Sequence, residues 1–233
     1  MNRYSRPFPF TPNLTPATVG FLCSAVLSIV AITTSTTLNR DGMLYVDAAR
    51  VFLSDGLSAA VGVFPWPFLS VLMALLSKAT SLDIETCGHI LNVLFMAGTS
   101  AFLISCSEKI FPEAAWPVCL TLLAIPGIND YRNELLREYG CWFFISLSFW
   151  IALRWADSPR WRTACLAQAT LVLAALFRPE ALAFLATLVV WQAFEAPSNE
   201  RFRRLSMIGS LSILVLALIA GLAAADLLPQ RLA

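Results

Sequence analysis

Long apolar segments recur through the whole chain and are separated only by short polar stretches. Of the 233 residues, 58% are hydrophobic and only 13% are charged, whereas soluble globular proteins carry about 25% charged residues. An apolar helix of roughly 20 residues is long enough to cross a bilayer. The pattern therefore predicts an all-α integral membrane protein. No polar block is long enough for a soluble domain, and no basic cluster indicates a nucleic-acid partner.

We expect about seven transmembrane helices in a single membrane domain, residues 1–233. Their approximate bounds are 19–37, 87–105, 116–128, 139–153, 163–176, 181–194 and 206–227. Residues 1–18 contain Arg3 and Arg6 and are expected to form a cytoplasmic tail. The apolar run that follows is too long for the core of a signal peptide. Residues 38–86 then form the first outward loop, with juxtamembrane helices.

The segment 63–77 allows two topologies. Pro65 and Pro67 prevent a clean helix start before Trp66, and the apolar run after them has only about ten residues, where a crossing helix needs roughly 20. We interpret the segment as a juxtamembrane or re-entrant helix with Trp66 at the interface; a short crossing helix is the alternative. Without a crossing, the arginine-rich loops 154–162 and 195–205 face the cytoplasm, as the positive-inside rule favours.

This topology places most charged residues near the ends of the predicted spans on the outer face. They are Asp41, Asp47, Asp55, Glu85, Asp130, Arg132, Glu134, Arg137, Glu138, Arg178 and Glu180. Ionisable groups at membrane depth are costly and usually line a cavity. The sequence therefore predicts a charged cavity that opens outward.

Residues 39–56 are the most polar stretch of the chain. Written as a helix from Asp41, they place an apolar face on one side, formed by Leu44, Ala48, Val51 and Phe52. Asp41 and Tyr45 fall on other faces of this helix. A carboxylate at this boundary could act as a general base toward an acceptor hydroxyl. Asp41 could equally be the N-cap of an interfacial helix, and the two roles are compatible.

Two later charged groups are open to similar alternatives. Arg132, Glu134 and Arg137 fit an interfacial helix with ion pairs three residues apart, or a wall that binds a phosphate or pyrophosphate through guanidinium groups. The turn Arg178-Pro179-Glu180 fits either a tight hairpin in the headgroup region or a contact from Arg178 to a lipid-linked phosphate.

His89 and the cysteines carry weaker signals. His89 is the only histidine and begins a predicted span, where it is a polar anchor or a catalytic group. The six cysteines lie in or beside apolar runs without a Cys-x-x-Cys pair, so we expect no metal site from their spacing. Small buried hydrophobic residues are the simplest interpretation of them.

Several of these pieces, in this order, resemble the GT-C superfamily of integral-membrane glycosyltransferases that use polyprenyl-phosphate sugars. The resemblance includes its protein O-mannosyltransferase and aminoarabinose-transferase branches and covers roughly residues 15–195. It is carried by Asp41…Tyr45…Ala49, Phe64-Pro-Trp-Pro-Phe-Leu, Leu91-Asn-Val-Leu-Phe, Tyr131…Glu134 and Leu176-Phe-Arg178-Pro179-Glu180. The family pattern in the first outward loop is similar to Asp-x-x-x-Tyr-x-x-x-Ala.

The resemblance implies a shared module of seven spans and an inverting transfer on the outer, periplasmic face of a bacterial inner membrane. Asp41 matches the acidic residue that binds or deprotonates the acceptor. Arg178, with Arg132 or Arg137, matches positions that contact the phosphate of the donor. His89 stands where many members carry arginine. The expected substrate-binding set is Tyr45, His89, Arg132, Glu134, Arg137, Arg178 and Glu180.

A polyprenyl-phosphate-linked sugar is the only cofactor-like molecule that the resemblance implies, with its lipid tail in a groove near Trp66 and Phe68. Dependence on a divalent metal stays open. Members usually have further spans and often a soluble C-terminal domain, so this chain of 233 residues is short for the family and is expected to be truncated or to need a membrane-protein partner. A non-catalytic membrane subunit and a transporter of lipid-linked sugars are the alternative functions.

Overall fold

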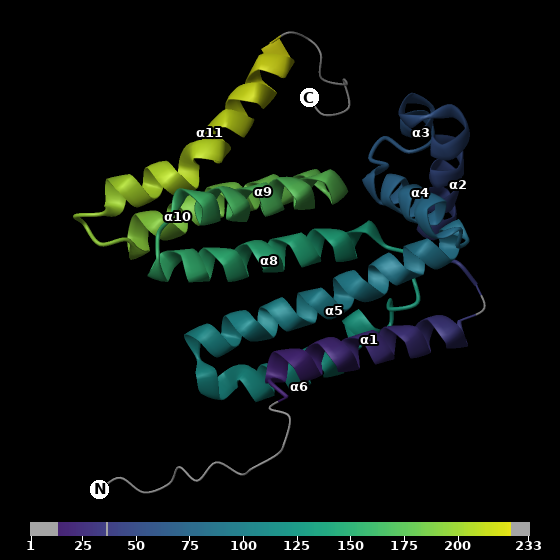
Figure 1. Ribbon diagram of the computed structural model, residues 1–233, viewed down its shortest axis with the longest axis horizontal. Helices are drawn as coiled ribbons and strands as arrows, with labels where there is room; N and C mark the ends of the chain where they lie inside the picture. The colour runs from purple at the N-terminus through teal and green to yellow at the C-terminus, as the bar shows by residue number, and fades with distance from the viewer. Residues whose placement is uncertain (1–13, 36, 225–233) are drawn as a thin grey trace, which may run out of the picture.

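Helices make up nearly all of the architecture in the part of the chain that the structure describes, residues 14–35 and 37–224 of a computed structural model (Figure 1). The longer helices are α1 (Pro16–Thr34), α2 (Arg40–Asp55), α5 (Ile84–Ile110), α8 (Arg137–Asp157), α9 (Trp161–Phe177) and α11 (Arg201–Ala224). The shorter helices are α3 (Leu57–Val63), α4 (Phe68–Thr80), α6 (Ala115–Ala124), α7 (Pro126–Asn129) and α10 (Ala183–Glu195), with 3₁₀ turns η1 (Pro112–Ala114) and η2 (Pro179–Leu182). The prediction of an all-α protein is confirmed.

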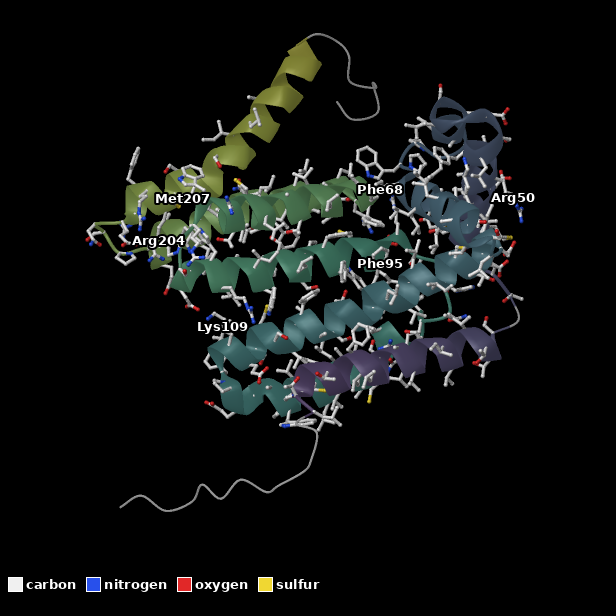
Figure 2. The ribbon with its side chains drawn as sticks, in the orientation of Figure 1. Arg50, Phe68, Phe95, Lys109, Arg204 and Met207 are labelled. Carbon is white, nitrogen blue, oxygen red and sulfur yellow. The ribbon has the colours of Figure 1, made fainter. Side chains whose placement is uncertain are left out.

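The long helices lie side by side and define two ends of a bundle (Figure 1). One end, here called the Asp41 end, holds α2, α3 and α4, the start of α5, the start of α8 and the end of α9. The opposite Lys109 end holds the end of α5, the end of α8 and the start of α11. Lys109 and Arg204 lie at this second end, far from Arg50 (Figure 2).

Capping residues set where the two most apolar long helices begin. The side chain of Thr15 accepts a hydrogen bond from the amide of Thr18, and Pro16 occupies the first turn of α1. Asp83 caps α5 by accepting a bond of 2.9 Å from the amide of Glu85. Such side chains satisfy the amides that a helix start leaves unpaired. The starts of α1 and α5 are therefore determined by residues next to them in the sequence.

The helices α2, α3 and α4 stay together at the Asp41 end. Gly56 has a φ of 85°, a conformation that suits glycine, and it turns the chain between α2 and α3. Helix α4 begins only at Phe68, directly after Pro65 and Pro67. Its 13 residues give a length of about 20 Å, shorter than a hydrocarbon core of about 30 Å.

An aromatic core fixes this end of the bundle. Phe177 contacts Phe68 edge to face with ring centroids 4.9 Å apart, and Phe95 in the same way at 5.4 Å. A Cβ atom at Gly140 would come within 2.3 Å of the Phe177 ring. Helix α8 can therefore pack this closely against Phe177 only because residue 140 is a glycine. The indole of Trp66 donates a hydrogen bond of 3.0 Å to the carbonyl of Ala175. Trp66 and Phe68 thus attach the α3–α4 turn to the end of α9.

A second core holds the Lys109 end of α8, α9, α10 and α11. It contains Trp155, Leu171, Leu188 and Ile208, all buried. Helix α11 packs at Met207 and Ile208, and beyond them it leaves the bundle at an angle (Figure 1). Ile213 and Leu214 in this part are exposed.

Each of the seven predicted segments overlaps a helix of the described residues, with one correction, whereas residue 36 of the first segment and residues 225–227 of the last lie outside the described residues. The predicted helix 116–128 is broken at Ile125, because Pro126 follows it. Helix α6 has only 10 residues, which is about 15 Å or half a hydrocarbon core. Two of the described helices, α1 and α5, are long and apolar enough to cross a membrane. Their length and composition are compatible with a membrane location.

Candidate functional site

Three charged side chains meet at the Asp41 end and form what we call the Arg178 cluster: Arg178, Glu138 and Glu180. The guanidinium of Arg178 donates to Glu138 Oε1 at 2.7 Å and to Glu180 Oε1 at 3.2 Å. Its Nε also donates to Glu180 Oε2 at 3.4 Å. Arg178 follows α9, Glu180 lies in η2 and Glu138 lies in the first turn of α8. The turn between α9 and α10 and the first turn of α8 therefore create the cluster.

The cluster is charged and accessible. The hydrogen bond from Arg178 lowers the pKa of Glu180, and the same bond raises the pKa of Arg178. Glu180 is exposed over 66% of its side chain and Glu138 over 25%. Glu138 Oε2 is buried and has no hydrogen-bond partner among the described residues. One carboxylate oxygen of the cluster is therefore buried beside Arg178 without a donor of its own in the described part of the chain.

Tyr45 lies within the field of these charges. Burial raises its pKa to about 12, Arg137 and Arg178 act in the opposite direction, and Glu138 and Asp41 add to the rise. The phenol therefore stays protonated near neutral pH and can donate a hydrogen bond. The prediction that Tyr45 lies off the apolar face of its helix is wrong.

The buried face of α2 is different from the expected one. It consists of Gly42, Tyr45, Val46, Ala48 and Ala49, whereas Leu44 is exposed. The physical reason is that Tyr45 packs edge to face on Phe64, with ring centroids 5.3 Å apart. Phe64, which follows α3, thus determines which face of α2 is buried. The hydrophobicity pattern within α2 contains no information about this distant partner.

Arg137 is the second cation of this region. Its guanidinium carbon lies 5.2 Å from the centroid of the Phe64 ring, a distance at which cation–π attraction operates. No ion pair involves Arg137 in the ranges 14–35 and 37–224. In contrast to Arg178, it offers its donors to a ligand without first losing a carboxylate.

Asp41 lies on the exposed side of α2 at the same end. It lines an open hollow of about 570 Å³ with Arg40, Met43, Leu44 and Asp47. Asp41 is not the N-cap of α2: the helix begins at Arg40 and Asn39 occupies the cap position. The carboxylate of Asp41 therefore remains available to solvent and to an acceptor.

The expected helix with ion pairs around Arg132 and Glu134 is not formed, because residues 130–136 are turns and extended chain. Side-chain amides satisfy this irregular backbone instead. Asn39 Oδ1 accepts from the amide of Leu135 at 3.1 Å, and Asn92 donates to the carbonyl of Glu134 at 3.2 Å. The side chain of Glu134 lies 3.5 Å from Asn39 Nδ2. Glu134 thus belongs to the joint between α2 and the start of α8.

The structure places Arg132 away from the Arg178 cluster. Its Nη1 donates to the carbonyl of Ser24 at 3.0 Å, to Ser24 Oγ at 3.0 Å and to Ser28 Oγ at 2.9 Å. Its Nε donates to Asn129 Oδ1 at 2.6 Å. Only 3% of the residue is exposed. Arg132 is therefore a tie between α1 and the segment after α7, and the expectation that it contacts a donor phosphate has no geometric support.

His89 also lies apart from the cluster. It lines an apolar groove of about 310 Å³ between α1 and α5, together with residues that include Ile29, Thr33 and Val93. Its Nε2 is 3.9 Å from Glu85 Oε1, one turn earlier on α5. This placement fits a polar anchor near a helix end better than a catalytic group.

Sequence reasoning placed Glu138 among the charged residues of the outer face but left it out of the substrate-binding set, and it did not include Phe64 in the site. Glu138 directly follows Arg137, and its place before a long apolar run was the available signal. Nothing local marked Phe64, because its role depends on Tyr45 and Arg137 from two other helices. Among the described residues, no group of three His, Cys, Asp or Glu side chains is arranged to hold a metal ion.

No family model matches this sequence, and neither a curated protein nor a solved structure does. Function therefore has to be argued from the site.

Proposed function

We propose that the chain is a membrane-embedded glycosyltransferase of the GT-C type. It would move a sugar from a polyprenyl-phosphate donor to an acceptor on the periplasmic face of a bacterial inner membrane. The observation that carries the proposal is the Arg178 cluster with Tyr45, Arg137 and Asp41 around it: two guanidinium groups, a phenol and carboxylates at the end of an apolar bundle.

The proposed topology has seven spans, formed by α1, α5, the α6–α7 segment, α8, α9, α10 and α11, with the Asp41 end outside. The segregation of charge supports it. Arg204, in the first turn of α11, donates to the carbonyl of Ala156 at 3.0 Å, which attaches the start of this arginine-rich helix to the end of α8. Cytoplasmic loops are rich in arginine and lysine. The helices α2, α3 and α4 stay outside in this arrangement, and residues 63–77 do not cross.

The broken third span fits a membrane protein only if its backbone is satisfied. Irregular backbone at membrane depth is tolerated where it is buried in protein or lines a water-filled cavity. Asn129 donates to the carbonyl of Leu123 at 2.9 Å, and Tyr139 donates to the carbonyl of Tyr131 at 2.5 Å. With Asn39 and Asn92, these groups satisfy the carbonyls of Leu123, Tyr131 and Glu134 and the amide of Leu135.

In the proposed reaction, the acceptor hydroxyl oxygen attacks the anomeric carbon of the donor sugar. The bond from that carbon to the phosphate oxygen breaks, and the polyprenyl phosphate leaves with the electron pair. Asp41 takes the proton of the acceptor hydroxyl as the general base. Attack opposite the leaving group inverts the anomeric configuration.

Arg137 and Arg178 would stabilise the negative charge that develops on the leaving phosphate, which is commonly the largest electrostatic contribution to such a step. Arg178 is already balanced by two carboxylates, so a phosphate has to displace one of them. Glu180 is the one to move, because its side chain is far more exposed than that of Glu138. Glu138 would then hold Arg178 in place, since its side chain is only 25% exposed.

The variant Asp41→Asn tests this proposal. Full-length protein in nanodiscs is given undecaprenyl-phosphate-linked mannose, glucose or aminoarabinose, and released undecaprenyl phosphate is quantified by mass spectrometry with native membrane extract as the acceptor source. Asp47→Asn is the matched control, since it lines the same hollow. We expect loss of general-base catalysis, about 100-fold or more, in the first variant and little change in the second.

If correctly inserted Asp41→Asn protein releases the lipid phosphate at the wild-type rate, the role of Asp41 is wrong. If the wild-type protein releases no undecaprenyl phosphate from any donor, the result favours the alternative function, a non-catalytic membrane subunit.

A further inference from the structure

A second charged pocket lies at the Lys109 end, where α5 and α8 end together. It is an open cavity of about 600 Å³ lined by Ser105, Glu108, Lys109, Trp150, Arg154, Asp157 and Ser158. This volume falls within the range of about 300–1,000 Å³ that is usual for small-molecule sites. The proposed transferase chemistry uses none of these residues.

The charges of this pocket are of both signs and cancel. Lys109 bonds Asp157 and joins the two helices. The other two charged residues of the pocket are Glu108 and Arg154. They have no ion pair or side-chain hydrogen bond in the part of the chain that the structure describes. The pocket therefore presents one unpaired anion and one unpaired cation on neighbouring helices. A ligand with a single charge would leave one of them without a partner.

Trp150 restricts the cation that can bind. The guanidinium of Arg154 lies 4.0 Å from the centroid of the Trp150 ring, and Phe102 packs against the same indole with ring centroids 5.5 Å apart. A quaternary ammonium group is recognised on open aromatic faces, and Arg154 already occupies a face of this ring. A primary ammonium instead offers three N–H donors, which suit Glu108, the exposed oxygens of Asp157 and the serine hydroxyls.

We propose that this pocket binds a group that combines a phosphate with a primary ammonium, as in the headgroup of phosphatidylethanolamine or in soluble phosphoethanolamine. Arg154, held against Trp150, binds the phosphate through its planar fork of donors. Glu108 binds the ammonium. The site lies at the end of two apolar helices, where headgroups are found if the bundle spans a membrane, and it does not depend on the transferase activity.

The experiment uses full-length protein in nanodiscs with equal mole fractions of phosphatidylethanolamine, phosphatidylcholine and phosphatidylglycerol. Lipids retained by the protein after release are counted by native mass spectrometry. We expect phosphatidylethanolamine to be retained about tenfold more than either other lipid, the difference that one charge-assisted hydrogen bond produces. Arg154→Gln and Glu108→Gln should each abolish that preference.

Two controls keep the result interpretable. Arg160→Gln and Glu113→Gln change exposed charges outside the pocket and should retain the wild-type preference. Glu108→Lys makes the pocket net positive and should shift the preference toward phosphatidylglycerol. A new preference for phosphatidylglycerol cannot come from a misfolded protein. The Glu108→Lys variant therefore tests the site even if the glutamine variants are unstable.

Soluble phosphoethanolamine, titrated into protein in phosphatidylcholine nanodiscs, separates the two sources of the ligand. Binding that Arg154→Gln removes, without a preference among lipids, supports the site with a soluble ligand. Equal retention of the three lipids together with no binding of phosphoethanolamine overturns the proposal. So does a preference that survives both Arg154→Gln and Glu108→Gln.

Discussion

Arg132 and Arg178 belong to two regions that look alike in the sequence but differ in the folded protein. Arg132 is almost completely buried and bonds serine and asparagine oxygens of α1 and α7. Arg178 is 36% exposed along its side chain and bonds two carboxylates. A buried arginine with neutral partners ties helices together, whereas an exposed arginine between movable carboxylates can exchange one of them for a ligand. The comparison separates a structural cation from a candidate binding cation.

The largest effect should come from the exposed region. Arg178→Gln removes the proposed charge stabilisation of the leaving phosphate, and we expect release of undecaprenyl phosphate to fall about 100- to 1,000-fold. The stability should change by about 1 kcal/mol, because the ion pair with Glu180 is largely exposed and the pair with Glu138 is partly exposed. Transferase assays and thermal unfolding of the same detergent preparation measure both quantities. Destabilisation as large as that of an Arg132 variant would mean that the Arg178 cluster is structural.

The buried region should respond in the opposite way. Arg132→Met leaves Ser28 Oγ and Asn129 Oδ1 without the guanidinium donor, and we expect a loss of about 3 kcal/mol in the free energy of unfolding. Arg50→Met is the matched control, since Arg50 is exposed on α2, and it should change stability by about 0.5 kcal/mol or less. Unfolding by denaturant in mixed micelles provides the measurement. If the Arg132→Met protein has wild-type stability but no activity, Arg132 is part of the functional site and not a structural tie.

The smallest effect concerns pH. Arg178 lowers the pKa of Glu180 from 4.5, so their bond stabilises the folded protein above the pKa of the unfolded state. This stability is lost as the pH falls below 4.5 and through the lower folded pKa. Because Glu180 is largely exposed, the contribution should be below about 1 kcal/mol. Unfolding of wild type and Glu180→Gln, compared from neutral to acid pH, should converge at low pH. A difference that grows on acidification would contradict the assignment.

The local sequence was sufficient for most helix positions. Apolar run length located the helices at α1, α5, α8, α9, α10 and α11. The expectation that Pro65 and Pro67 prevent a helix start before Trp66 agrees with the start of α4 at Phe68. These features act within a few residues of where they occur, because a proline removes an amide donor and restricts its neighbour. Pro126 ends α6 for the same reason, so the prediction of one continuous helix over 116–128 was wrong.

The composition of the site depended on contacts between distant segments. Asp41, Tyr45, Arg137 and Arg178 were predicted together and lie at one end of the bundle, but Arg132 and His89 were predicted with them and lie elsewhere. Glu138 joined the site because α9 ends beside the start of α8. Charge and spacing alone could not separate these cases, since each depends on which neighbour a side chain meets after packing.

The sequence by itself determined a strongly apolar chain that is helical through most of its described residues, with many of its charged residues near helix ends. It could do so because hydrophobic run length and helix caps are local properties. Only the tertiary structure decided which arginine is buried against serines, which one lies between carboxylates, and that Phe64 turns Tyr45 inward. Those outcomes depend on burial and on partners far away in the chain, and burial decides whether a charge binds a ligand or holds a fold together.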